Sequence, residues 1–538
     1  MDRDALHRAL PAVYSPRDIG SVFAALGYAP CWDTLDQHSH IVARWGAFRV
    51  VAPDQPGRDA LRTLVSSMAR AGNRALAAGV DATGLILSAP RLGTGAGTRL
   101  LAIPRDDPPR LALQLVEELH PRPRDTALTL TLRSADVLSS EAAGRQFFAA
   151  FRSLLDRMAA VLPPDASLAE RQMAALLQLT RVLFLYFVQA KGWLAGRPYF
   201  LRETLDQALA SGIAFHRRIL QPLFFGTLNR PVPERTGPFR QAAIPYLNGG
   251  LFEVHPVERR WGRIAFPNEL WRDAFDQVFE RFRFCVREAE EVNAIAPDML
   301  GHVFERVMDH EERHATGTFY TPEPVVKQLV GAAVETALTD RQGIHPQLAA
   351  RVVAGEQVTP QEARRLTAAL RRLRILDPAV GSGAFLLVAL ESLVDLRAGL
   401  HGQADRARRQ RWRREILRRN LFGVDRSPLA VRLAELRLWL AVIADDPADS
   451  PADVAPLPNL DGVVRQGDSL HDTLGAVGAL TGLADLIPLR APGTAAVTRA
   501  RTALFDATGR SGRRAAKHLR AVELQWARCT IDAALSRV

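Results

Sequence analysis

The sequence predicts an α/β protein in three parts: an N-terminal α/β domain (residues 1–138), a helical middle domain (139–310) and a second α/β domain (311–538). Short strand-like runs between turn residues predict the first part, and long helical apolar periodicities predict the second. Strand–turn–helix units with acidic residues at the strand ends predict the third. The 538 residues are enough for roughly two to four domains with buried cores.

The composition indicates a globular protein that binds a polyanion. Apolar residues make up 47% and charged residues 24% of the chain, and the net charge is +11. A basic surface raises the local concentration of DNA or RNA. Lysine occurs only at Lys191, Lys327 and Lys517, so arginine supplies nearly all of the positive charge. A biased codon composition is therefore an alternative explanation of the charge.

The cysteines and the apolar stretches indicate the cellular compartment in which the protein is expected. Cys31, Cys285 and Cys529 are far apart and form no CxxC pair, which excludes a local zinc knuckle and gives no disulfide framework. The N-terminus has no apolar signal region, and the apolar stretch 182–188 is too short to span a bilayer. We expect a soluble cytoplasmic protein without a membrane partner.

The N-terminal part is predicted to be a mixed α/β unit. Strands are expected at 48–52, 84–87, 99–103 and 126–132, the last because Thr, Ala and Leu alternate along it. Metal ligation is conceivable for four polar residues nearby, Asp33, Asp36, His38 and His40. A polar loop is the preferred interpretation, and we assign no metal site to the chain.

The middle part is predicted to be helical. Ser167 and Glu170 form a capping-box pair at the start of a long helix that runs to Lys191. Its apolar residues cover more than one face, so we expect it to be buried between other helices. Further helices are expected at 200–210, 214–225, 267–288 and 297–308. The glycine turn within 245–252 is interpreted as a rigid connection between helices.

The third part begins with two capped helices. Thr321 is a good N-cap and Pro322 a good first helical residue, so a helix is expected to run from there to about Thr339. Thr359 and Glu362 repeat the capping pattern for the helix that leads into the next strand.

A strand, a tight turn and a helix follow, over residues 374–396. The apolar strand ends at Asp377, and Gly381 and Gly383 precede the helix that starts at Ala384. Such a turn lets the backbone approach a ligand closely at the N-terminus of a helix. A carboxylate at the strand end suits a cationic ligand group better than a phosphate.

Two further strands are expected to end in acids. One, 421–425, ends in Asp425, and the other, 463–466, is followed by Asp468. Ligands of open parallel sheets bind at the carboxyl ends of the strands, where an acid also suits the hydroxyls of a ribose. Three acids in register favour a nucleoside-binding site; the alternative is that each acid caps a helix or is solvated at a strand end.

The set TGTFYTP, DPAVGSGAFL, NLFGVDRSPLAV and GDSL resembles the adenosylmethionine-binding half of the amino-methylating DNA methyltransferases. Within them it is most similar to adenine-N6 enzymes of type IIG restriction-modification and BREX-like phage-defence systems. LTRVLFLYFVQAKGWL and PYLNGGLFE, in the helical part, resemble stretches of the same proteins. The resemblance covers roughly residues 140–538 and implies an incomplete Rossmann-like class I methyltransferase domain that uses S-adenosylmethionine and acts on double-stranded DNA.

The resemblance also implies roles for single residues. Thr321 would lie near the methionine carboxylate of the cofactor, and Asp377 would face its amino group. Gly381 and Gly383 would let the backbone come close.

At the nucleoside end, Asp425 would bind the ribose hydroxyls and Asp468 the exocyclic amine of the cofactor's adenine, with Ser469 beside the ring.

The catalytic motif of that family is missing. An Asn/Asp-Pro-Pro-aromatic tetrapeptide holds the flipped adenine in the family. None occurs in the 538 residues; Asp107-Pro108-Pro109-Arg110 comes closest and lacks the aromatic residue. We therefore assign no catalytic residue to this chain.

In the family the missing fourth strand lies beside the strand that ends at Asp377. Its absence would leave a strand edge unpaired and apolar surface uncovered. Two explanations remain open: a second polypeptide with the catalytic motif and the target-recognition domain completes the sheet, or the chain is a truncated gene product.

The arginine cluster from Arg406 to Arg419 has two interpretations: it tracks DNA phosphates, or it is the solvated face of a helix. We assign no site to it.

The resemblance therefore implies a component of a site-specific adenine-N6 DNA methyltransferase from a restriction-modification or phage-defence system, dependent on a partner chain for catalysis. The alternative is a non-catalytic DNA-binding or assembly subunit, or a truncated pseudoenzyme, of such a system.

Overall fold

The computed structural model describes residues 2–71, 75–90, 100–106, 108, 110–138, 140–247, 250–261, 265–285, 294–295, 300, 321, 323–402, 404–469, 494–507 and 509–535. The chain forms two compact units. The first comprises Met1–Leu154 with Arg272–Val303, and the second comprises Leu155–Trp271 with Phe304–Val538.

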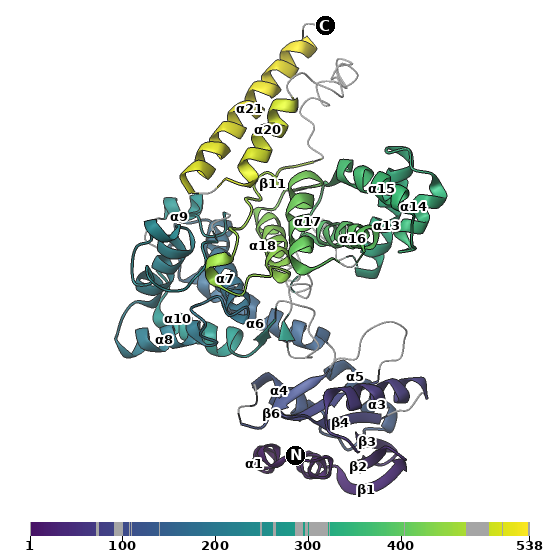
Figure 1. Cartoon of the computed structure of the whole chain (residues 1–538). Coiled ribbons are helices and arrows are strands. Elements are labelled where there is room, and N and C mark those ends of the chain that lie inside the picture. The colour runs from purple at the N-terminus through teal and green to yellow at the C-terminus, as the bar shows by residue number, and fades with distance from the viewer. Residues whose placement is uncertain are drawn as a thin grey trace. The chain divides into compact units, whose positions relative to one another are not determined.

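The first unit is built on a six-stranded sheet with the order β1-β2-β3-β4-β5-β6 (Figure 1). Its strands are β1 (Ala29–Asp36), β2 (Ser39–Trp45), β3 (Phe48–Pro53), β4 (Ala75–Val80), β5 (Gly84–Ser88) and β6 (Leu101–Pro104). All neighbouring strands are antiparallel except β3 and β4, which are parallel. The strands expected at 48–52, 84–87 and 99–103 are confirmed as β3, β5 and β6.

Helices cover this sheet and enclose its core. They are α1 (Arg3–Ala9), α2 (Ile19–Ala25), α3 (Arg58–Arg70), α4 (Arg110–Glu118), α5 (Ala127–Val137) and most of α6 (Ser140–Ala160), with 3₁₀ turns at Leu10–Ala12 and Pro16–Asp18. Leu61, Val65 and Met68 of α3 pack with Val51 and Ile86 of the sheet. A short parallel pair, β7 (Arg283–Phe284) and β8 (Ala294–Ile295), also belongs to this unit.

The strand expected at 126–132 is wrong, because these residues begin α5. Thr126 is the N-cap of the helix, and its side chain and that of Thr129 form a reciprocal capping box. Leu130, Ser134 and Val137 are buried at helical spacing. The alternation of Thr and Leu fits both periods over so few residues, and the cap together with the apolar residues beyond it favours the helix.

The polar loop expected around 33–40 is instead a β-hairpin, since β1 and β2 pair through it. Asp33 forms an ion pair of 2.6 Å with Arg44 on the neighbouring strand. His40 lies 2.7 Å from a carboxylate oxygen of Asp54. A cross-strand ion pair such as that of Asp33 with Arg44 explains a polar residue on the exposed face of a strand.

The helical part of the second unit contains α7 (Leu168–Ala190), α8 (Phe200–Ala210), two π-helical segments (His216–Leu220 and Pro222–Leu228), a 3₁₀ turn at Val232–Glu234, α9 (Pro256–Arg260) and the start of α10 (Asn268–Ala274). The helices expected at 200–210 and 214–225 are confirmed. The helix expected at 267–288 is wrong in its second half, where α10 is followed by a π-helical turn (Phe275–Phe279) and β7. The helix expected at 297–308 lies outside the described residues except Leu300.

The predicted capping box of α7 is confirmed, because Ser167 and Glu170 each accept a hydrogen bond from the backbone of the other. The helix is 23 residues long, so it is longer than the apolar stretch 182–188 suggested. It is the one helix among the described residues that is long and apolar enough to cross a bilayer, but 89% of its apolar window is buried within the protein. That burial fits a core helix of the unit, as expected from its apolar residues on several faces.

The remaining part of the second unit has a three-stranded parallel sheet with the order β11-β10-β9. Its strands are β9 (Ile375–Asp377), β10 (Leu421–Asp425) and β11 (Val464–Gln466). Its helices are α13 (Glu323–Asp340), α14 (Pro346–Val353), α15 (Pro360–Arg372), α16 (Ala384–His401), α17 (Arg406–Arg419), α18 (Pro428–Ala444), α20 (Thr494–Phe505) and α21 (Gly509–Leu535), with a 3₁₀ turn at Pro451–Asp453. Parallel strands joined through helices confirm the α/β fold class and the Rossmann-like character.

Candidate functional site

The turn between β9 and α16 is shaped by two glycines with left-handed backbone. Gly381 has a φ of 51° and Gly383 a φ of 87°. A Cβ on Gly381 would meet no atom within 4 Å, so the turn borders open space at this residue. A Cβ on Gly383 would lie 3.1 Å from Ala434 on α18. Gly381 thus offers the open backbone that a ligand could approach, whereas Gly383 is required for helix packing.

Asp377 ends β9 with one carboxylate oxygen satisfied and the other not. Its Oδ1 accepts a hydrogen bond of 3.1 Å from the backbone N–H of Ala379. Its Oδ2 is buried and has no hydrogen-bond partner among the described residues. Burial raises the pKa of Asp377 above its ordinary value, and the nearby Asp425 raises it further. A buried oxygen without a partner is costly, and a cationic group of a ligand would satisfy it.

Asp425 lies at the end of β10, next to Asp377. The strand register places Gly423 opposite Asp377 and Asp425 opposite Gln466. Oδ2 of Asp425 accepts a hydrogen bond of 2.8 Å from the N–H of Gly381, and Oδ1 accepts one of 2.8 Å from the N–H of Ser427. The alternative interpretation, in which the acid caps neighbouring backbone N–H groups, therefore describes part of the role of Asp425. Each carboxylate oxygen keeps a second lone pair for a ligand hydroxyl.

The third strand brings its end to the same edge of the sheet. The N–H of Gly467 donates to the backbone oxygen of Asp425 at 2.9 Å. The hydroxyl of Ser469 donates to the backbone oxygen of Pro378 at 2.6 Å, so Ser469 lies against the turn after β9. Asp468 is exposed beside it.

Three hydrogen bonds thus bring the predicted residues together around the glycine turn. They join Asp377 to Ala379, Gly381 to Asp425, and Ser469 to Pro378. Thr321 is half-buried and precedes α13, but its neighbours 301–320 and Pro322 lie outside the described residues. Its place in the site remains a prediction.

Two buried polar residues that the sequence did not single out support this edge. Arg437 on α18 donates from Nη1 to the backbone oxygen of Ser382 at 3.0 Å, and so holds the glycine turn. Asn420 donates from Nδ2 to the backbone oxygens of Leu370 and Leu373 at 2.9 and 2.8 Å, and so ties the end of α15 to the start of β10. The available signal for Arg437 was a charged residue within the largely apolar helix α18, which also carries Arg432 and Glu435.

The arginines of α17 are largely engaged within the fold. The buried Arg413 pairs with Glu391 on α16 at 2.5 Å and with Asp445. Arg414 donates to the backbone oxygen of Pro456 at 2.8 Å, and Arg418 pairs with Asp506 at 3.0 Å. These contacts favour a structural role over phosphate binding for this face of the helix.

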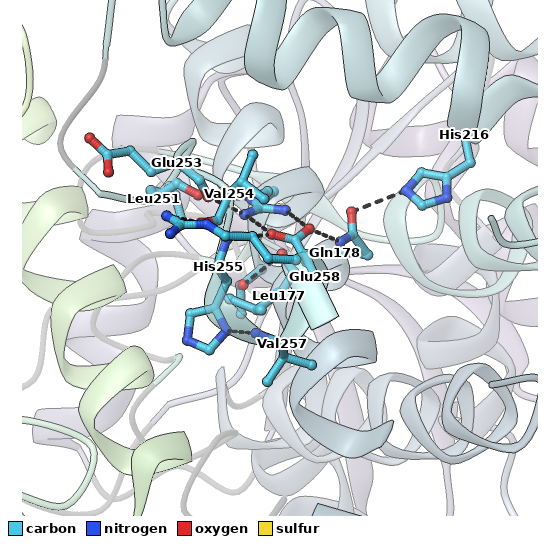
Figure 2. Close-up of polar contacts among 12 residues, drawn as sticks. Leu177, Gln178, His216, Leu251, Glu253, Val254, His255, Val257 and Glu258 are labelled. Atoms are coloured by element: carbon cyan, nitrogen blue, oxygen red, sulfur yellow. Dashed lines mark hydrogen bonds and ion pairs between the residues drawn. The ribbon is translucent and has the colours of Figure 1, made fainter. Parts of the chain in front are cut away.

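A second buried polar cluster lies in the helical part, around Arg181 of α7 (Figure 2). Arg181 is fully buried and pairs with both carboxylate oxygens of Glu258, at 2.6 and 2.9 Å. Burial acts to raise the pKa of Glu258, but the charge and hydrogen bonds of Arg181 outweigh it and lower that pKa to about 2. Arg181 also donates to the backbone oxygens of Leu251 and Glu253, both at 2.8 Å.

His216 extends this cluster through Gln178, which lies between His216 and Glu258 in Figure 2. The N–H of Phe266 donates to Nδ1 of His216 at 3.2 Å, so Nε2 carries the proton and donates to Gln178 at 3.2 Å. Gln178 in turn donates to Glu258 at 2.7 Å. Burial lowers the pKa of His216 to about 4, which keeps the ring neutral near pH 7. Every group of the cluster has a partner, so its role is structural.

The same cluster fixes the segment 245–253, whose residues 248–249 lie outside the described residues. Arg181 holds Leu251 and Glu253, while a Cβ on Gly250 would lie 3.7 Å from the indole of Trp439 on α18. The N–H of Leu457 donates to the backbone oxygen of Leu247 at 2.6 Å. The described residues on both sides of the turn are therefore held in place and link the helical part to the three-stranded sheet, while the rigid connection expected at the turn itself stays a prediction.

The acidic strand ends and the open turn can hold a ligand that combines a cationic group with hydroxyls. Asp377 offers an unsatisfied acceptor for the cation, and Asp425 and Asp468 offer further acceptors along the same edge. Within the described ranges no group of three or more His, Cys, Asp or Glu residues is arranged to hold a metal ion.

Residues 354–458 match the family model of the MmeI DNA-methyltransferase domain. The chain is 30% identical over 337 residues to a putative type II restriction enzyme and methyltransferase of Methanocaldococcus jannaschii. The match covers 57% of this chain and 28% of that protein, so the chain spans little more than a quarter of this curated relative.

Two solved structures are also similar. The type IIL restriction-modification enzyme MmeI in complex with DNA is 18% identical, with a TM-score of 0.41, over 68% of this chain and 48% of that chain. The DrdV–DNA complex is 15% identical, with a TM-score of 0.24, over 82% of this chain and 38% of that chain. At these TM-scores neither likeness adds to the structural argument.

Proposed function

The chain is related to the methylases of type II restriction-modification systems, and on this premise we propose that it is the S-adenosylmethionine-binding component of a site-specific adenine-N6 DNA methyltransferase. The observation that carries the proposal is the buried, unpartnered Oδ2 of Asp377 at the end of β9, beside the open backbone at Gly381. An ammonium group is the ligand chemistry that such an oxygen requires.

S-adenosylmethionine supplies an activated methyl group together with an ammonium, a ribose and an adenine. Asp377 accepts from the ammonium group, and Gly381 leaves space for the backbone approach. Gly383 shapes the same turn, and Thr321 faces the carboxylate end.

Asp425 uses its free lone pairs for the ribose hydroxyls. Asp468 accepts from the exocyclic amine of the cofactor's adenine, and Ser469 lies beside that ring.

Catalysis needs a further polypeptide in this proposal. β9 forms the edge of the parallel sheet among the described strands, and Leu376 in its middle is 61% exposed. An exposed apolar residue on a strand edge suits pairing with another strand. A second polypeptide that carries the Asn-Pro-Pro-aromatic motif and the target-recognition domain supplies that strand, and the assembly acts on double-stranded DNA in the cytoplasm.

The cofactor site is tested by calorimetric titration of S-adenosylmethionine into the wild-type chain and into Asp377→Asn and Asp425→Ala. Each substitution removes hydrogen bonds to a charged group, so we expect affinity to fall by roughly 10- to 100-fold. Asp449→Asn removes an exposed acid outside the site and serves as the control. Circular dichroism of each variant checks the fold. Unchanged affinity in Asp425→Ala would refute the site.

A second candidate function is a non-catalytic DNA-binding or assembly subunit. It is the alternative that the resemblance leaves open, because no catalytic residue is assigned to this chain. Transfer of labelled methyl from S-adenosylmethionine to DNA distinguishes the two, measured with and without the polypeptide encoded next to this gene. Methyl transfer only with the neighbour supports the split enzyme. No transfer in either mixture, with DNA still bound, supports the second candidate.

A further inference from the structure

α20 and α21 form a helical hairpin at the β11 side of the sheet (Figure 1). The two helices enclose a small apolar core of their own, with Ala500 and Leu504 from α20 and Leu519 from α21. Ala515 and Val522 of α21 pack against it. The apolar side of α21 is therefore already occupied, and its opposite side is free for another purpose.

The opposite side of α21 carries exposed basic residues, with the exposed Leu524 among them. Lys517, Arg520 and Arg528 are exposed, as is Arg513 one turn earlier. At 3.6 residues per turn these four lie within a narrow stripe, on the side of the helix away from Leu519. The stripe extends roughly 22 Å from Arg513 to Arg528, at about 1.5 Å per residue.

The acidic residues nearby do not neutralise this stripe. Between Gly509 and Val522 the sequence contains no Asp or Glu. Glu523 lies on the packed side of α21 and pairs with Arg465 of β11 at 2.7 Å. Lys517, Arg520 and Arg528 form no ion pair with any described residue, unlike the arginines of α17.

The hairpin is anchored next to the candidate cofactor site. Besides the pair between Glu523 and Arg465, the guanidinium of Arg501 stacks 3.7 Å from the ring centroid of Phe422 on β10. The N–H of Asn459 donates to the backbone oxygen of Phe505 at 3.0 Å. Contacts to both β10 and β11 give the basic stripe a fixed position relative to the sheet.

We propose that this stripe, Arg513, Lys517, Arg520 and Arg528, binds the phosphodiester backbone of duplex DNA. Arginines spaced along one rigid helix, without acids among them, match a row of phosphates better than they match the mixed charges of a protein surface. The contacts are independent of base sequence and orient the duplex over the sheet. This inference rests on the proposed function, because it assigns to the same assembly a site for its DNA.

The test compares two triple variants with the same change in charge. Lys517→Gln/Arg520→Gln/Arg528→Gln removes the stripe, and Gln preserves helix propensity. Arg513 is left in place because its positive charge also acts on the carboxyl group of Glu253, where it opposes the rise in pKa that burial causes. The control, Arg341→Gln/Arg364→Gln/Arg372→Gln, removes three exposed arginines from the region of α13 and α15. Fluorescence anisotropy with a short labelled duplex gives the dissociation constant of the full chain over a range of salt concentrations.

Each phosphate contact contributes about 0.9 to the slope of log affinity against log salt. We expect the stripe variant to lower that slope by roughly 2 to 3 and the affinity at 0.1 M salt by about 100-fold, and the control to change neither appreciably. Equal losses in both variants, or binding by the stripe variant equal to wild type, would overturn the inference.

Calorimetry with S-adenosylmethionine separates this result from the proposed function. Cofactor binding by the stripe variant at wild-type affinity, with weakened DNA binding, supports both. If the chain binds DNA through the stripe but does not bind S-adenosylmethionine, the inference about the DNA surface stands and the proposed function is refuted. Failure of the wild-type chain to bind duplex DNA refutes the surface.

Discussion

The backbone N–H of Gly381 donates a hydrogen bond of 2.8 Å to Oδ2 of Asp425, 44 residues further along the chain. This bond ties the turn after β9 to the end of β10. The two residues are therefore held against each other before any ligand binds, which lowers the ordering cost of binding.

The two glycines of the turn are expected to respond differently to alanine. Gly383→Ala places a Cβ 3.1 Å from Ala434 and in left-handed backbone, so we expect the free energy of unfolding to fall by about 2 kcal/mol or more. Gly381→Ala adds only the backbone strain, about 1 kcal/mol, because nothing lies near its Cβ. Urea denaturation of both variants checks the order, and a larger loss in Gly381→Ala would contradict it.

Asp377→Asn is expected to make the protein more stable and to weaken cofactor binding. Burial raises the pKa of Asp377, so its ionised form is less favourable in the folded chain than in the unfolded chain. The ionised Asp377 therefore destabilises the folded chain at pH values above its folded-state pKa. The neutral amide of asparagine removes this destabilisation. Urea midpoints at pH 7 measure stability, and calorimetry measures binding. A lower midpoint would show that the carboxylate is already satisfied without a ligand.

Arg181→Met is expected to be severely destabilising, by about 3–5 kcal/mol, because it leaves the buried Glu258 without its cation. It also removes the donors that hold the backbone at Leu251 and Glu253. The matched control is Arg260→Met, which breaks the pair with Glu170 and removes a side chain that is 67% exposed. We expect a much smaller change there. Comparable losses in the two variants would argue against the buried cluster as a structural anchor.

Stability is expected to fall as the pH drops below about 6.5. The unfolded chain takes up protons near the ordinary pKa of histidine, while burial holds the pKa of His216 at about 4 in the folded chain. Because the unfolded state then binds more protons, His216 alone costs about 2 kcal/mol by pH 5. His255, whose pKa burial also lowers to about 4, acts in the same direction. Urea midpoints between pH 7 and 5 measure the slope, and His216→Gln should flatten it; an unchanged slope would assign the effect to other groups.

The strand ends of the candidate site were predictable because their signals are local. An apolar run, an acid and a glycine turn lie within a few residues of one another at Asp377, and the same holds at Asp425. The predictions for two other segments were wrong for physical reasons. At 126–132 an alternating pattern coexists with a helical one, and at 33–40 the ion pair between Asp33 and Arg44 joins residues on two paired strands. Local sequence does not show such pairings.

The role of Arg181 was not predictable for a related reason. Its partners Leu251, Glu253 and Glu258 lie at least 70 residues away, so nothing near position 181 shows that its charge is neutralised. The packing of Gly383 against Ala434 likewise depends on a helix that begins later in the chain.

The contacts between α7 and the sheet region have a practical consequence. Nζ of Lys191 donates to the backbone oxygen of Asp446 at 2.8 Å, and Nε1 of Trp193 donates to that of Ala448 at 3.0 Å. A fragment cut at residue 311 to isolate the cofactor region would lose both donors and uncover the indole of Trp439. The helices therefore cover part of the sheet region, and a fragment suited to crystallography, calorimetry or domain exchange should retain α7 with its capping residue Ser167.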